Sequence, residues 1–192
     1  MNDGLIPLPP GHVGAVVTFL EMTAPPPPEP VPASALTVVR WDALDPDRYR
    51  DLFRRVGARW LWFSRLAMSD AELGAKAGEV HEVVGPDGAS AGMIELDFDA
   101  PGLCRIRFLG LVPELAGQGH GSWLFAETLA RAWRPGIERV TVHTCSLDHP
   151  AALPAYLKAG FTAYARAFES FPDPRLAGLL PRDAAPQLPL VG

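Results

Sequence analysis

The chain has 192 residues, of which 48% are hydrophobic and 20% are charged, and its formal net charge is −5. This composition excludes a wholly disordered chain, and the acidic balance argues against nonspecific binding to nucleic acid, which requires a basic surface. The length predicts one domain over residues 1–192 with a core of ordinary size.

The cysteines and the N-terminal residues bear on the cellular compartment. Cys104 and Cys145 are the only cysteines, so no disulfide framework is expected and a reducing compartment is favoured. Residues 1–10 lack the basic stretch of a signal peptide, and the apolar run Val13–Leu20 is too short to span a bilayer. We therefore expect a cytoplasmic protein with no membrane partner.

Strand and helix patterns alternate along the first half of the chain. Runs rich in β-branched and aromatic residues predict strands, and Asp45 followed by Pro46 is typical of a helix N-terminus. The turn Gly85–Gly88 lies between two strand patterns and predicts a hairpin. The predicted elements are strands at Ala15–Met22, Ala35–Trp41, Glu79–Val84 and Ala91–Phe98 and helices at Asp45–Val56 and Ser69–Ala77.

Two proline-rich segments and one aromatic cluster interrupt this pattern. Residues 24–32 predict a stiff, exposed loop of the polyproline II type, and residues 175–192 predict a loosely held tail. Trp60, Trp62 and Phe63 are expected either in the core or in the wall of an acceptor pocket. The sequence leaves both interpretations open.

A strand, a glycine-rich turn and a helix follow one another in the second half of the chain. The run Cys104–Val112 predicts the strand, and Gly117, Gly119 and Gly121 come shortly after it. An apolar helical pattern begins directly after these glycines. A helix N-terminus offers free N–H groups and a partial positive charge, so this layout predicts a phosphate site.

The glycine spacing distinguishes among known classes of phosphate site. A dinucleotide fingerprint requires a glycine where the chain has Ser122, and a P-loop requires a Gly-Lys-Ser/Thr triplet that the chain lacks. The observed spacing instead resembles the acyl-CoA loop of the GNAT acetyltransferase superfamily, with Gly119 and Gly121 at its two small positions. Ala116 departs from that loop, because arginine or glutamine is usual there. A dinucleotide-binding protein and a turn without a ligand are the alternatives.

A second segment lies downstream of the glycine turn. Arg139–Cys145 predicts a strand, Asp148 or His149 is expected to cap the next helix with Pro150 in its first turn, and Phe161–Phe168 predicts a final strand. This segment resembles the GNAT pattern Asn-x-x-Ala-x-x-x-Tyr-x-x-x-Gly-Phe, although His149 stands at the asparagine position. The matching positions are Ala152, Tyr156, Gly160 and Phe161.

The resemblance implies the GNAT fold, an α/β arrangement with a central mixed, mostly antiparallel sheet flanked by about four helices. It also implies acetyl transfer from acetyl-CoA to a primary amine of a small molecule or a peptide, by direct attack in a ternary complex. A catalytically silent acetyl-CoA-binding module is the alternative, and a homodimer stays open. The expected coenzyme contacts are Leu111, Val112, Gly117, Gln118, Gly119, His120, Gly121, Ser122, His149 and Tyr156.

The reaction requires an exposed strand edge, a proton donor and a proton acceptor. Residues 109–112 are expected to pair with the amides of pantetheine, splayed by a bulge at Gly110. Tyr156 matches the family tyrosine near the CoA sulfur and is expected to be the general acid. The general base is expected at Glu95 or His143, because no carboxylate lies on the strand before the glycine turn.

Two further chemistries are weighed from the same residues. Cys145 is considered as a covalent nucleophile, but that role requires a base partner and a lowered pKa. The histidines have no metal-ligand spacing, so no metal is expected.

Overall fold

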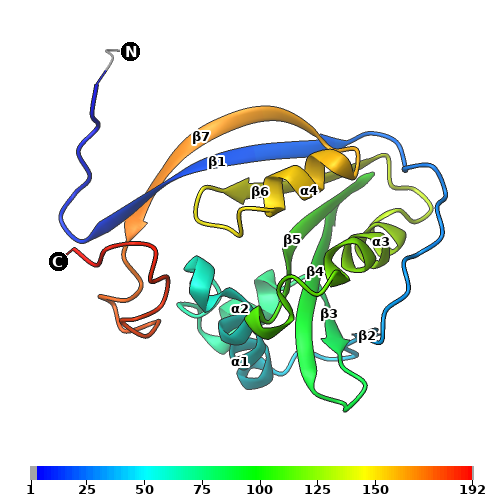
Figure 1. Cartoon of the computed structure of the whole chain (residues 1–192), viewed down its shortest axis with the longest axis horizontal. Coiled ribbons are helices and arrows are strands. Elements are labelled where there is room, and N and C mark those ends of the chain that lie inside the picture. Colours follow the sequence, from blue (N-terminus) through cyan, green and yellow to red (C-terminus); the bar gives the residue numbers. More distant parts are fainter. Residues whose placement is uncertain (1–3, 192) are drawn as a thin grey trace.

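A computed structural model describes residues 4–191, which form a seven-stranded sheet with the strand order β2-β3-β4-β5-β6-β1-β7 (Figure 1). Every neighbouring pair of strands is antiparallel except β5 and β6, which are parallel. The elements in chain order are β1 (His12–Met22), β2 (Thr37–Arg40), α1 (Pro46–Gly57), α2 (Asp70–Lys76), β3 (Glu79–Val84), β4 (Ser90–Ala100), β5 (Leu103–Leu111), α3 (His120–Ala132), β6 (Arg139–Cys145), α4 (Ala152–Lys158) and β7 (Thr162–Pro172).

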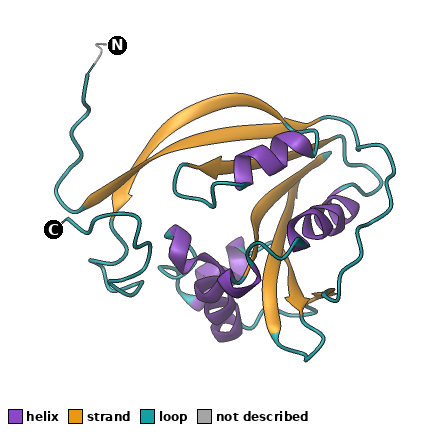
Figure 2. Cartoon of the chain, in the orientation of Figure 1, coloured by secondary structure: helices purple, strands orange, loops and turns teal. Residues whose placement is uncertain are grey.

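The helices divide between the two faces of the sheet (Figure 2). Helices α1 and α2 pack on one face, where Phe53 and Leu73 belong to one buried hydrophobic cluster. Helices α3 and α4 pack on the other face, where Trp123 and Tyr156 belong to a second cluster. The mixed, mostly antiparallel sheet flanked by helices is therefore confirmed.

Side-chain caps determine where the first two helices begin. The Asp45 carboxylate accepts hydrogen bonds from the N–H groups of Asp47 and Arg48, both at 3.1 Å. Ser69 and Glu72 form a reciprocal capping box at the start of α2. Both helices lie where the sequence predicts them, within one or two residues at each end.

The predicted cap of α4 is wrong. This helix begins at Ala152 after Ala151 without a side-chain cap, and His149 accepts a hydrogen bond only from the Ala151 N–H before the helix, through Nδ1 at 3.1 Å. Asp148 is not available as a cap, because its carboxylate accepts hydrogen bonds from the Thr144 hydroxyl and the Cys145 N–H. The carboxylate therefore ties the end of β6 to the loop that follows it.

The prediction of a loosely held tail is wrong for residues 175–191. Asp173 and Arg175 form a buried ion pair, and the Arg175 guanidinium also donates to the carbonyl oxygens of Ala184 and Leu188. Ala185 is fully buried in the cluster beneath α1 and α2. The proline-rich composition gave no sign that Arg175 would bind carbonyl oxygens across this segment and hold it against the domain.

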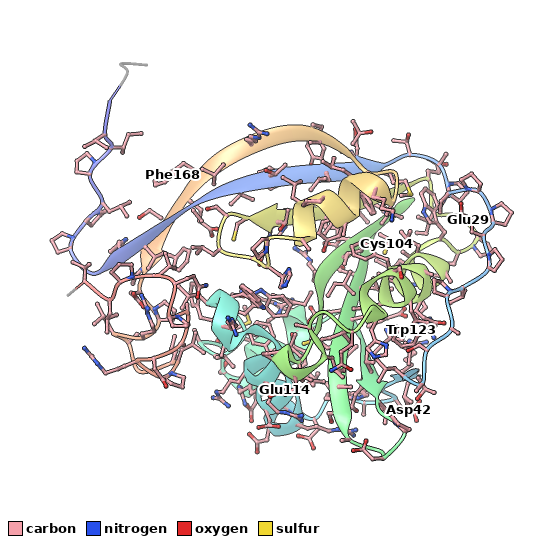
Figure 3. All side chains as sticks on the ribbon, viewed as in Figure 1. Glu29, Asp42, Cys104, Glu114, Trp123 and Phe168 are labelled. Carbon is pink, nitrogen blue, oxygen red and sulfur yellow. The ribbon has the colours of Figure 1, made fainter. Side chains whose placement is uncertain are left out.

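The proline-rich loop over residues 24–32 agrees with its prediction in part. It is mostly exposed and lies in no helix or strand. Glu29 projects from it at the outer edge of the molecule (Figure 3). Just beyond this loop the Ser34 hydroxyl lies 3.2 Å from Nδ1 of His120, so the chain returns across the start of α3.

The parallel pair β5 and β6 separates after a short ladder. Pairing runs only from Leu103 with Arg139 to Ile106 with Val142, and the strands then diverge. The β4–β5 register shifts between Ile106 and Phe108, so the bulge lies at Arg107 rather than at the predicted Gly110. The divergence leaves one edge of each strand without a partner strand.

Gly110 has a different role from the one predicted. The β4–β5 register continues through it, with Gly110 opposite Met93. A Cβ atom at this position would lie 2.7 Å from Cγ1 of Val56 and 3.4 Å from the Trp62 ring. Glycine therefore permits α1 and the segment after it to approach the strand closely.

Candidate active site

A cavity of about 670 Å³ lies where β5 and β6 diverge. Phe108 and Val112 belong to the cluster beneath α1 and α2, whereas Leu109 and Leu111 belong to the cluster beneath α3 and α4. All four residues line the cavity. Because residues facing both sides of the sheet line one space, the cavity passes through the sheet at the divergence.

The glycine turn forms one part of the cavity wall. Gly117 and Gly119 adopt positive φ angles of 76° and 84°, which favour glycine, and Gly119 directly precedes α3. No heavy atom lies within 4 Å of a Cβ built at Gly117, Gly119 or Gly121, so a ligand can approach the backbone of the turn closely, although the Gln118 N–H donates to the Leu115 carbonyl oxygen at 3.4 Å. The turn therefore has the free donors and the approach that a diphosphate requires.

The predicted coenzyme contacts lie mostly along this cavity. Gln118 and Ser122 have exposed side chains and do not line it, and the Gln118 side chain donates to the Glu114 carbonyl oxygen at 2.8 Å. Glu114 itself projects from the turn between β5 and α3 (Figure 3). The predicted contacts that do line the cavity are Leu111, Val112, Gly117, Gly119, His120, Gly121, His149 and Tyr156.

Tyr156 lies on α4 with its ring buried and also lines the cavity. The edges of Phe125 and Phe161 pack around it, with ring centroids 5.0 and 5.7 Å away. Burial raises the pKa of the Tyr156 hydroxyl above its usual value, and the negative charge of Asp148 raises this pKa further. The hydroxyl therefore keeps its proton at neutral pH.

Asp148 is a cavity residue that the sequence did not identify as functional. One carboxylate oxygen lies 3.3 Å from the Trp62 indole nitrogen, and the other accepts from the Thr144 hydroxyl at 2.7 Å and the Cys145 N–H at 2.8 Å. The sequence carried no distinguishing signal, because the contact with Trp62 joins residues that are 86 positions apart.

Glu95 lies apart from this cavity. Its side chain is fully buried, and its carboxylate accepts hydrogen bonds from the Tyr49 hydroxyl, the Arg65 guanidinium and, at 3.4 Å, the Gly78 N–H. It is not among the residues that line the cavity. The structure therefore separates the two predicted bases and places Glu95 in a buried ion pair with Arg65.

His143 and Cys145 lie on β6 and both line the cavity. The His143 ring is exposed and rests against Phe19, with the ring centroids 5.9 Å apart. Burial raises the pKa of the Cys145 thiol to about 11, and the charge of Asp148 contributes to the rise. A raised pKa opposes formation of the thiolate, so Cys145 lacks the property that a covalent nucleophile requires.

Aromatic rings form a second part of the cavity wall. Trp62 lies between Phe53 and Phe108, with ring centroids 5.5 and 5.1 Å away, and Phe63 packs on Phe171 at 4.9 Å. These rings are part of the cluster beneath α1 and α2, and all but Phe53 also line the cavity. Of the three residues of the predicted aromatic cluster, Trp62 and Phe63 thus belong both to the core and to the cavity wall, and Trp60 lines the cavity without belonging to the core cluster.

Metal-ligand clusters and membrane-spanning helices are both absent from the described part of the chain. Within residues 4–191, no group of three or more His, Cys, Asp or Glu side chains is arranged to hold a metal ion. No helix in the described part of the chain is both long enough and apolar enough to cross a membrane.

A model of the acetyltransferase (GNAT) family matches residues 19–161, which include the glycine turn, the diverging strands and α4. The chain belongs to this family. No curated protein matches the sequence of this GNAT protein.

Solved structures of other GNAT proteins share the fold at low sequence identity. A GCN5-related N-acetyltransferase from Sphaerobacter thermophilus is 20% identical with a TM-score of 0.59, and the match covers 85% of this chain and 52% of that one. A GNAT-family acetyltransferase, described as putative, from Novosphingobium aromaticivorans is 20% identical with a TM-score of 0.53, over 87% of this chain and 69% of that one.

A third solved structure contains the coenzyme. Spermidine N-acetyltransferase from Vibrio cholerae, in complex with CoA and spermine, is 17% identical with a TM-score of 0.54, over 69% of this chain and 84% of that one. The present chain spans about half the length of the Sphaerobacter protein. At these identities the likeness concerns the fold.

Proposed function

We propose that this GNAT protein transfers the acetyl group of acetyl-CoA to a primary amine by direct attack in a ternary complex. The observation that carries the proposal is the cavity through the sheet, which is lined from both faces at the divergence of β5 and β6. Two substrates can therefore approach one point from the two sides of the sheet. Family membership supports the same chemistry.

The coenzyme occupies the side of the cavity formed by the glycine turn, α3 and α4. The free N–H groups of the glycine turn and of the first turn of α3, within residues 117–122, bind the diphosphate without a metal ion; the Gln118 N–H is not among them, because it donates to the Leu115 carbonyl oxygen. The unpaired edge of β5 over residues 109–112 pairs with the pantetheine amides in the manner of an added strand. A backbone N–H of the same edge stabilises the negative charge that develops on the thioester oxygen.

The amine enters from the side formed by the aromatic rings. An ammonium ion first loses one proton, which the exposed His143 in the cavity wall passes on to solvent. The nitrogen lone pair then forms a bond to the carbonyl carbon, and the bond between carbon and sulfur breaks. The sulfur takes the Tyr156 proton, and the second proton of the attacking nitrogen returns through solvent to Tyr156.

The deciding experiment measures release of free CoA thiol from acetyl-CoA with a panel of amines. Thiol release that requires both the protein and an amine, together with mass-spectrometric detection of the acetylated amine, supports the proposal. Binding of acetyl-CoA without thiol release from any amine would instead identify a catalytically silent acetyl-CoA-binding module.

The dinucleotide alternative has its own test. A ligand that binds only the folded state raises the unfolding temperature, by an amount that depends on its concentration relative to its Kd. We expect CoA to raise the unfolding temperature and NAD to leave it unchanged. Stabilisation by NAD and not by CoA would contradict the assignment of the glycine turn.

A further inference from the structure

Asp148 is a negative charge in the cavity wall that is surrounded by neutral hydrogen-bond donors. Its partners are the Trp62 indole, the Thr144 hydroxyl and the Cys145 N–H. None of the ion pairs found within residues 4–191 involves it. Neutral donors leave the charge of this half-buried carboxylate without a counter-charge, so the cavity favours a ligand with a positive charge.

The arginines of the cavity wall do not supply that cation. Arg65 is paired with the buried Glu95, and the Arg107 guanidinium donates twice to one carboxylate oxygen of Asp97, at 2.8 and 2.6 Å. His149 accepts a hydrogen bond from the Ala151 N–H through Nδ1 at 3.1 Å, which requires that nitrogen to be unprotonated. Both arginines of the wall are therefore already paired with carboxylates.

A second carboxylate reinforces this charge from the rim. Glu169 lies on β7 and lines the cavity, but its side chain is exposed. An ion pair at an exposed position contributes little affinity, although it adds to the negative potential that attracts a cation. One strong ammonium position at Asp148 is therefore expected, together with a weak one at the rim.

Aromatic rings line much of this side of the cavity, alongside polar residues that include Ser64, Arg107 and His143. Trp60 packs edge-on against His149 with ring centroids 5.2 Å apart, and Phe108 packs against Phe53 at 4.7 Å. The rings that line the cavity are those of Trp60, Trp62, Phe63, Phe108 and Phe171, and Trp62 contacts the Asp148 carboxylate. Flat apolar groups gain from burial and from ring stacking at such surfaces.

The carboxylate also shares its cavity with the proton donor of the proposed reaction. Asp148 and Tyr156 both line this cavity, and the charge of Asp148 contributes to the raised pKa of the Tyr156 hydroxyl. An ammonium bound at Asp148 therefore lies in the same cavity as the Tyr156 side chain. The ion pair would hold the amine in place until it loses its proton and attacks.

We propose that the acceptor is a primary monoamine with an aromatic or similarly flat apolar body, held by its ammonium group at Asp148. This inference rests on the proposed function and specifies its substrate class. A polyamine would need an anionic partner for each further ammonium group, and Glu169 at the exposed rim would add little affinity as a second partner. An α-amino acid would bring its own carboxylate toward Asp148 and Glu169, and like charges repel.

The first test measures binding in the absence of turnover. The full chain is saturated with CoA, and 2-phenylethylamine, spermidine and phenylalanine are titrated into it by calorimetry near neutral pH. We expect 2-phenylethylamine to bind at least about 10-fold more tightly than the other two. Spermidine has ammonium groups that lack a strong carboxylate partner, and the carboxylate of phenylalanine is repelled by Asp148. Tighter binding of spermidine or phenylalanine, or no binding of 2-phenylethylamine, would overturn the substrate class.

The second test uses Asp148→Asn, which keeps the shape of the side chain and removes its charge. The variant should weaken binding of 2-phenylethylamine by about 10- to 100-fold and leave the affinity for CoA unchanged, because a charge-assisted hydrogen bond is lost. Asp51→Asn is the matched control, because Asp51 lies exposed on α1 and does not line the cavity. It should change neither affinity.

The outcomes separate the two proposals. Loss of CoA binding in the unmodified chain would overturn the proposed function itself. A second outcome is normal CoA binding together with thiol release with 2-phenylethylamine at the same rate in the unmodified chain and in Asp148→Asn. That outcome would overturn only the role of Asp148. A Trp60→Ala variant adds a check on the wall, since it should weaken binding of 2-phenylethylamine more than binding of methylamine.

Discussion

Tyr156 is the side chain whose surroundings bear most directly on proton transfer. We predict that Tyr156→Phe lowers kcat by about 100-fold or more, the usual range for loss of a general acid, while the KM for acetyl-CoA stays nearly constant. The measurement is steady-state thiol release. Tyr164→Phe is the matched control, because Tyr164 is exposed on β7 and does not line the cavity. Equal rates for the Tyr156 variant and the unmodified chain would remove the acid role.

For Glu95 we predict a loss of stability rather than a direct effect on catalysis, because its carboxylate is enclosed between Tyr49 and Arg65. Glu95→Gln leaves the Arg65 charge buried without compensation, so we expect the free energy of unfolding to fall by about 3 kcal/mol. Urea denaturation measures this loss. Arg65→Met in the same chain should restore part of it. A stable Glu95→Gln variant without turnover would instead restore Glu95 as the base.

The contrast between Glu95 and Asp148 shows how far the sequence predicts single side chains. Tyr156 could be identified from its motif because the motif lies within one helix and its flanks. The roles of the two carboxylates depend on Arg65 and Trp62, which lie 30 and 86 positions away from them. No local pattern encodes such partners, because they meet only when the sheet and the α1–α2 segment pack together.

At the level of secondary structure, the turn between β5 and α3 is the element on which coenzyme binding depends. We predict that Gly119→Glu abolishes CoA binding, because it places a side chain and a negative charge where the diphosphate approaches. Calorimetric titration with CoA measures the effect. Gly136→Glu is the matched control, since Gly136 also has a positive φ and open space around it but lies outside the cavity. Retained affinity in the Gly119 variant would place the diphosphate elsewhere.

Elements were predicted well where the local pattern was strong and less well where tertiary contacts decide. The β-branched run of β6 and the cap residues Asp45 and Ser69 act within a few residues, so their elements lie as predicted. The bulge at Arg107 depends on the pairing of β5 with β4, which one strand's sequence does not encode. The glycine at position 110 suggested a bulge but serves the approach of Val56 instead.

At the scale of the whole molecule, the buried ion pair between Asp173 and Arg175 joins the C-terminal segment to the domain. The hydrogen bonds from Arg175 hold the pKa of the Asp173 carboxyl below its usual value. A lowered pKa in the folded state stabilises the protein above the pKa of the unfolded chain, and this contribution is lost as pH falls through the folded-state pKa. We therefore predict that Asp173→Asn lowers the unfolding temperature at neutral pH and reduces its dependence on pH in the acid range.

Thermal unfolding between neutral and acid pH measures this effect. Asp183→Asn is the control, because Asp183 lies in the same segment with an exposed side chain. It should follow the unmodified chain at every pH. An Asp173→Asn variant with the acid sensitivity of the unmodified chain would show that other carboxylates govern acid unfolding.

The same C-terminal segment also supports one wall of the active site from behind. The Gln187 side chain donates to the Arg59 carbonyl oxygen at 3.1 Å, next to Trp60 and the rings that follow it. Leu180 and Ala185 lie in the hydrophobic cluster that contains Trp62, Phe63 and Phe108. Substitutions in residues 175–191, which do not line the cavity, can therefore change the selectivity for the amine while the affinity for CoA stays constant. Acceptor selectivity can thus diverge among related proteins through changes that leave the coenzyme site and the reacting side chains intact.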